Sequence, residues 1–134
     1  CIGGQIISDA AIYENYATYP EEREELLNRL DEEKITGVIF MSGDRHHTEI
    51  SKMERPDAYP LVDITCSPLT SKTYEVSEEG NSHLLKDKTF SQRNFGVVNV
   101  SGARLDRTLV LTIYDQKGEK VWDYSIKASD VTYK

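Results

Sequence analysis

The stretch VIFMSGDRHHTEIS, residues 38–51, carries the pattern that decides the fold. Val38 to Met41 form an apolar run without alternation, which is typical of a β-strand buried on both faces, as a parallel or central strand is. The run ends at Gly43, where the backbone is free to turn sharply. Asp44 and His46 follow at once. They therefore leave the carboxyl end of a rigid strand, the place where open α/β sheets bind ligands.

The elements predicted on either side of this strand make a mixed α/β layered fold. A helix is predicted over residues 19–34, because Pro20 suits the first helical position and three leucines form an apolar stripe. Further strands are predicted over residues 2–7, 60–67, 94–102, 107–115 and 120–127, with Gly118 in the last turn and a long polar surface loop over 71–94. One domain over residues 1–134 is expected, with no linker and no internal repeat.

The bulk composition excludes several classes of function. The net charge of -7 argues against a protein that binds nucleic acid through bulk charge. No apolar segment approaches the ~20 residues that span a bilayer. The two cysteines are too few for a disulfide framework, and Cys66 is expected to be a small buried hydrophobe on its strand.

The polar cluster after Gly43, which contains Asp44, His46, His47 and Glu49, allows two interpretations when only its residues are considered. Asp44 and His46 are two residues apart, so in extended chain their side chains project to the same side. A carboxylate and an imidazole there could each hold one of two adjacent metal ions, or both could hold one ion. In the other reading, residues 43–49 form an ordinary polar turn.

Four separated blocks then carry a family resemblance. They are YENYATYPEEREELLNRL (13–30), GVIFMSGDRHHTEI (37–50), ITCSPLTS (64–71) and RNFGVVNV (93–100). In this order they resemble the C-terminal part of the PhoD-like (alkaline phosphatase D) metallophosphatases, within the calcineurin-like phosphoesterases. The resemblance implies the C-terminal half of a four-layer α/β/β/α sandwich, with a mixed sheet and antiparallel C-terminal strands.

The resemblance also implies an activity and a site. The expected reaction is metal-dependent hydrolysis of phosphomonoesters or phosphodiesters, with calcium and iron, or other divalent ions, as cofactors. Asp44 would bind one metal and His46 the other, while Gly43 makes the turn. The parent protein is expected to be bacterial and periplasmic, cell-surface or secreted.

The chain departs from this family in one respect. The Asp-x-His, Gly-Asp-x-x-Asp and Gly-Asn-His motifs of the N-terminal half are not found outside SGDRHH, which belongs to the last motif and holds the one Gly-Asp pair of the chain. We therefore expect a C-terminal fragment that is inactive by itself. Its uncovered apolar sheet face would bind the missing N-terminal half or a second copy of the chain.

Four other polar residues near the motif blocks and one on the helix also carry expectations. His47 and Glu49 would orient His46 or touch the substrate, or they are ordinary loop residues. Arg93 and Asn94 would reach the phosphate or hold the long loop, and Arg23 is expected in solvated ion pairs on the helix. The alternative function from another class is a non-enzymatic β-rich binding or interaction domain that holds no metal.

Overall fold

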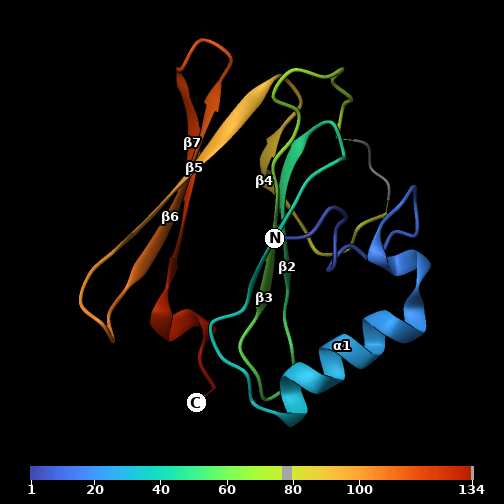
Figure 1. Ribbon diagram of the computed structural model, residues 1–134, viewed down its shortest axis with the longest axis vertical. Coiled ribbons are helices and arrows are strands. Elements are labelled where there is room, and N and C mark those ends of the chain that lie inside the picture. Colours follow the sequence, from blue (N-terminus) through green and yellow to red (C-terminus); the bar gives the residue numbers. More distant parts are fainter. Residues whose placement is uncertain (77–79, 134) are drawn as a thin grey trace.

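The computed structural model describes residues 1–76 and 80–133 and arranges them in three layers (Figure 1). A helix, α1, covers one side of a four-stranded sheet, and a three-stranded sheet lies on the other side. The elements in chain order are η1 (Tyr16–Thr18), α1 (Pro20–Glu32), β1 (Ile39–Ser42), β2 (Thr48–Met53), β3 (Leu61–Thr65), β4 (Leu84–Phe90), β5 (Asn94–Ser101), β6 (Thr108–Asp115), β7 (Lys120–Lys127) and η2 (Ala128–Val131). The predicted α/β class, with a mixed sheet and antiparallel C-terminal strands, is confirmed.

The four-stranded sheet has the order β1-β3-β2-β4, so the predicted central strand is in fact an edge strand. β1 is parallel to β3, as expected, but it is only half-buried, whereas every residue of β3 is buried. An apolar run does not distinguish a central strand from an edge strand that another segment covers. Here the backbone nitrogen of Ile2 donates to the carbonyl of Met41 at 2.9 Å, and the amino-terminal segment covers that edge.

The amino-terminal segment itself is not the strand that was predicted over residues 2–7. Ile6 and Ile7 are buried, but their backbone nitrogens donate to the side chain of Asp63 at 2.6 and 3.2 Å. On the other side their carbonyls accept from Arg23 of α1, each at 2.8 Å. Arg23 is therefore not in the solvated ion pairs expected of it, because its guanidinium satisfies the backbone of a buried segment.

The three C-terminal strands were predicted correctly. β5, β6 and β7 form an antiparallel sheet in this order, and Gly118 takes a positive φ of 83° in the last turn. The core lies where this sheet meets the four-stranded one. Ile50 and Ile64 are opposite each other in β2 and β3, and they belong to one buried cluster with Leu111 and Ile113 of β6.

Two strands were missed, β2 and β4. β4 lies inside the stretch 71–94 that was predicted to be one long loop; residues 77–79 of that stretch lie outside the described residues. Its sequence, LLKDKTF, is half polar, and the strand is stabilised by pairing with β2, where Thr48 lies opposite Phe90. In the described part of the chain, no helix has the length and apolar character needed to cross a membrane.

Candidate functional site

A cavity of about 620 Å³ opens at the carboxyl end of β1, on the loop that leads to β2. The expected ligands Asp44 and His46 both line it, and so does His47. Arg45 of the same loop also lines it, and the remaining wall comes from two other segments, Tyr13 and Glu14 on one side and Tyr74 and Glu75 on the other. The tertiary structure thus brings the strand-end cluster together with residues about thirty positions away on either side, and Tyr74 and Glu75 carried no signal in the sequence.

The turn after β1 is made by the candidate ligands themselves and not by Gly43. Asp44 and His46 have φ values of 65° and 60°, in the left-handed region that L-residues seldom occupy. Gly43 does not have a positive φ, so the expectation that it makes the turn was wrong. Non-glycine residues in this region persist only where their surroundings hold them, and they cluster at functional sites.

The ring of His46 is held by the segment that follows β3. Its Nδ1 lies 2.7 Å from the backbone carbonyl of Lys72, which can only accept, so Nδ1 carries a proton and, in the neutral ring, Nε2 holds the lone pair. Tyr74 packs against the same ring with centroids 5.1 Å apart, and its nitrogen donates to the His46 carbonyl at 3.0 Å. A backbone carbonyl on one ring nitrogen is the usual support of a histidine that binds metal through the other.

His47 and Glu49 do not orient His46; they pair with each other. Nε2 of His47 lies 3.1 Å from Oε2 of Glu49, and both side chains are buried. Gln5 of the amino-terminal segment donates to the other oxygen of Glu49 and, at 2.9 Å, to the hydroxyl of Thr65. The carboxylate is therefore fixed from two sides.

This polar network continues through the sheet to Asp63. The hydroxyl of Ser42 lies 3.0 Å from that of Thr65 and donates to Asp63 at 2.8 Å. Burial raises the pKa of Asp63 above its ordinary value, and the nearby charge of Glu49 acts in the same direction; hydrogen bonds from Ile6, Ser42 and Ile7 oppose them. The network joins the amino-terminal segment to the wall of the cavity.

Arg93 and Asn94 lie away from the cavity lining. Asn94 is buried, and its side chain accepts from Thr48 at 2.7 Å and donates to the carbonyls of Ser67 and Gln92 at 3.0 and 2.7 Å. Arg93 is exposed and donates to the carbonyl of Ser71 at 3.1 Å. Both side chains therefore hold the segment after β3 through its carbonyls. This agrees with the structural role that was one of the two expected for Arg93 and Asn94.

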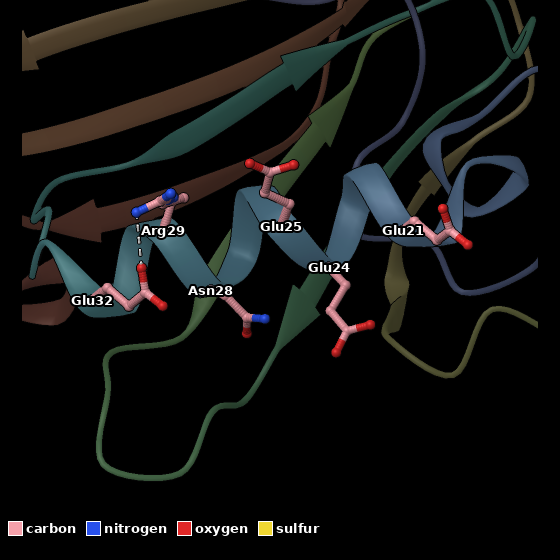
Figure 2. Close-up of a pocket in the computed structure, with 6 residues that line it drawn as sticks. All are labelled: Glu21, Glu24, Glu25, Asn28, Arg29 and Glu32. Atoms are coloured by element: carbon pink, nitrogen blue, oxygen red, sulfur yellow. Dashed lines mark hydrogen bonds and ion pairs between the residues drawn. The ribbon is translucent and has the colours of Figure 1, made fainter.

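A second hollow lies along the outer side of α1, where the side chains are mostly acidic (Figure 2). Its lining is Glu21, Glu24, Glu25, Asn28, Arg29 and Glu32. The Arg29 guanidinium pairs with Glu32 at 3.2 Å, three residues further along the helix. All six residues come from one exposed helix, so this surface is a solvated helix face.

The donor set of the first cavity suits a metal ion only in part. The exposed carboxylate of Asp44 and the Nε2 of His46 are an oxygen and a nitrogen ligand of the kinds that divalent and trivalent ions take. Within residues 1–76 and 80–133, no three side chains among His, Cys, Asp and Glu lie close enough together to hold an ion. These residues can therefore supply part of a metal site.

The fold and the cavity define an α/β protein with histidines and a carboxylate at the end of a strand. The chain belongs to the PhoD-like phosphatase family, whose pattern matches residues 6–118. Family membership indicates a phosphatase function, and hence a hydrolase. Neither the curated proteins nor the solved structures gave a significant match.

Proposed function

We propose that this chain is the part of a metal-dependent phosphoester hydrolase that supplies one metal-binding motif, with Asp44 and His46 as ligands. The observation that carries the proposal is the hydrogen bond from Nδ1 of His46 to the Lys72 carbonyl, which leaves Nε2 as a lone-pair nitrogen. Asp44 lines the same cavity. Calcium and iron are the ions that the family resemblance suggests.

The bound ions would polarise the phosphoryl oxygens and lower the pKa of a bound water, so that a hydroxide nucleophile exists at neutral pH. The chain's own residues would bind the ions and shape the cavity around the substrate. Asp44 supplies negative charge to the ions, and Arg45 supplies positive charge to the wall, with its guanidinium 5.0 Å from the centre of the Tyr13 ring. Tyr13 and Tyr74 give the cavity flat apolar walls suited to the organic part of a small phosphoester.

The remaining ligands would come from an N-terminal half of the same domain, since the motifs expected there are not in this sequence. The three layers seen here would then be part of a calcineurin-like four-layer sandwich, and the 134-residue chain alone would be inactive. Support comes from β5, whose Val97, Val98 and Val100 are 46%, 40% and 57% exposed. That surface would bind the missing half or a second copy of the chain. Export of the parent protein to the periplasm, cell surface or medium rests on the resemblance alone.

The experiment that tests this function is hydrolysis of a chromogenic phosphomonoester and phosphodiester by the full gene product, with calcium and iron supplied. Asp44→Ala and His46→Ala are expected to lower kcat/KM at least 100-fold, while the far-UV circular dichroism spectrum stays unchanged. Asp57→Ala is a matched control, because Asp57 also has a positive φ, 57°, but lies outside the lining of this cavity. It should keep full activity.

The opposite result would favour the other class of function. If Asp44→Ala and His46→Ala are as active as Asp57→Ala, or if all forms are inert with metals present, the strand-end cluster is not the metal motif. The non-enzymatic binding domain would then be the better account of the chain.

A further inference from the structure

Two tyrosines line the cavity with most of their side chains exposed. Tyr13 is 76% exposed and Tyr74 is 58% exposed, so neither ring is buried in the packing of its own loop. Tyr13 lies before α1 and Tyr74 after β3, so two segments far apart in the chain bring them to one site. Aromatic side chains that line a concave site are typical of surfaces that a ligand covers.

The loop that carries Tyr13 is held by contacts on two sides. Asn15 is buried, and its side chain donates to the carbonyls of Ala10 and Ile12 at 2.6 and 3.4 Å. From the loop after β1, Arg45 donates to the carbonyl of Ile12 at 3.2 Å, and its guanidinium lies 5.0 Å from the centre of the Tyr13 ring. The position of the exposed ring is therefore fixed before any ligand binds.

The backbone of Tyr13 also groups it with the candidate ligands. Its φ is 59°, and a positive φ is uncommon for a bulky residue. In the described part of the chain five non-glycine residues have a positive φ, and three of them, Tyr13, Asp44 and His46, line this cavity. Because such conformations cost free energy and cluster at functional sites, Tyr13 is placed in the same site as the two candidate ligands.

Tyr74 is held against one of those ligands. Its backbone nitrogen donates to the His46 carbonyl at 3.0 Å, and the two ring centroids are 5.1 Å apart with their planes tilted by 34°. Each tyrosine thus contacts one residue of the loop after β1, Arg45 or His46, and keeps most of its side chain exposed. Both rings are available to a molecule that binds at that loop.

We propose that Tyr13 and Tyr74 bind an uncharged aromatic ring in the organic part of the phosphoester, so that the site prefers such esters to those of saturated alcohols. The inference rests on the proposed function and names its substrate class. Stacked and edge-to-face contacts between aromatic rings stabilise beyond the area that they bury, and a saturated ring cannot make them. Glu14 and Glu75, which each follow one of the tyrosines, also line the cavity and would repel a ring that carries negative charge.

The first test compares benzyl phosphate with cyclohexylmethyl phosphate as substrates of the full gene product, with calcium and iron supplied. Both are esters of primary alcohols, and the saturated ring is the more hydrophobic, so a preference for benzyl phosphate does not come from apolar burial. Wild type should prefer benzyl phosphate in kcat/KM by about fivefold or more. Tyr13→Leu and Tyr74→Leu should each lower this ratio about two- to tenfold.

A second pair of substrates identifies the source of the ring. Adenosine 5′-phosphate and methyl ribofuranoside 5-phosphate share the sugar and differ in the nucleobase. A preference for the aromatic member in either pair, lost in the leucine variants, supports the proposal, and the pair that shows it tells whether the site takes a nucleoside or a simple aryl group. Equal kcat/KM within both pairs overturns it.

The ratio of two substrates is the readout because a merely structural defect leaves it unchanged. If the loss of the Tyr74 ring loosens His46, the rates with both substrates fall together. Tyr13→Phe and Tyr74→Phe keep the ring and should keep the wild-type ratio. Tyr19→Leu is the matched control, because Tyr19 is also 58% exposed but lies outside the lining of this cavity. A ratio that falls as far in Tyr19→Leu as in Tyr74→Leu contradicts the role given to the cavity tyrosines.

A binding measurement separates this inference from the proposed function. Benzylphosphonate and cyclohexylmethylphosphonate are not hydrolysed, and titration calorimetry compares their affinities for the same protein. If the gene product hydrolyses no ester but binds benzylphosphonate about fivefold or more tightly, and the leucine variants lose the difference, the proposed function fails and the aromatic subsite stands. If it hydrolyses all four esters without a preference, the proposed function stands and the subsite is wrong. Equal affinities in a protein that hydrolyses nothing overturn both.

Discussion

The carboxylate of Asp63 accepts a hydrogen bond from the backbone nitrogen of Ile6 at 2.6 Å, and this contact ties the amino-terminal segment to the centre of the sheet. The same oxygen also accepts from Ile7 at 3.2 Å. A buried carboxylate on β3 thus does what a neighbouring strand would do for these backbone groups.

Replacing Asp63 with alanine should destabilise the fold by about 3 kcal/mol or more, because two buried backbone nitrogens and the Ser42 hydroxyl lose their acceptor. Urea unfolding followed by circular dichroism measures this loss. Asp9→Ala is the control, since Asp9 also accepts from a backbone nitrogen, that of Ser82 at 2.8 Å, but is exposed. Asp9→Ala should lower the free energy of unfolding by less than about 1.5 kcal/mol. Equal costs for the two variants would contradict the role given to Asp63.

The pH dependence of stability should carry the signature of Asp63. Burial raises the pKa of this carboxyl in the folded state above its ordinary value of 3.8, so the folded state holds the proton to higher pH than the unfolded state does. The contribution of Asp63 is therefore fully present below pH 3.8, and it is lost as the pH rises through the raised pKa. Unfolding free energies of wild type and Asp63→Asn, measured in steps of pH, should show the advantage of wild type shrinking as the pH rises. If the advantage of wild type grew as the pH rises, the pKa of Asp63 in the folded state would be lowered and not raised.

Asn94 should prove to be a structural residue. Asn94→Ala removes the partner of the Thr48 hydroxyl and of two carbonyls in a buried position, which should cost about 2–3 kcal/mol. Arg93→Ala changes the preceding residue, whose side chain is exposed. It should alter the free energy of unfolding by less than about 0.5 kcal/mol. Thermal unfolding of both variants measures the difference. A stable Asn94→Ala protein with impaired hydrolysis would instead place Asn94 in the phosphate site.

Gly96 should resist substitution because a Cβ there would press on two side chains of the neighbouring strand β6 and on Cys66 after β3. A Cβ there would lie 3.1 Å from Leu111 Cδ1, 3.2 Å from Cys66 Sγ and 3.2 Å from Ile113 Cδ1. Both aliphatic neighbours are buried in close-packed surroundings, so Gly96→Ala should destabilise by about 1–2 kcal/mol. Gly3→Ala, where a Cβ meets nothing within 4 Å, is the control in the same unfolding assay. A Gly96→Ala variant as stable as Gly3→Ala would show that Leu111, Ile113 and Cys66 can shift to make room for a methyl group.

Association of the 134-residue chain should depend on β5. Among the described residues this strand pairs only with β6, which leaves its other edge and several valines exposed. Val100→Lys should weaken self-association at least tenfold in sedimentation experiments. Leu105→Lys makes the same change of charge at a residue that is 90% exposed but lies off the strand, and it should have little effect. If both variants behave as wild type does, β5 is not the surface through which copies meet.

The sequence by itself determined the elements that depend on local pattern. The helix with Pro20 at its start, the parallel pairing expected of the apolar run in β1 and the three antiparallel C-terminal strands all follow from periodicity and turn residues. The position of Asp44 and His46 after β1 could be predicted in the same way, because a side chain's place in its own element needs no knowledge of distant residues. Their role as ligands stays a prediction.

Only the tertiary structure decided which residues meet. That β3, and not β1, is central, that β4 lies in a polar stretch, and that Ile6 and Ile7 pair with Asp63 are consequences of contacts between segments far apart in the chain. The same holds for the cavity, since Lys72 and Tyr74 reach His46 through the path of the chain after β3. Hydrogen-bond partners of buried polar groups are chosen by proximity in space, and local pattern contains no information about them.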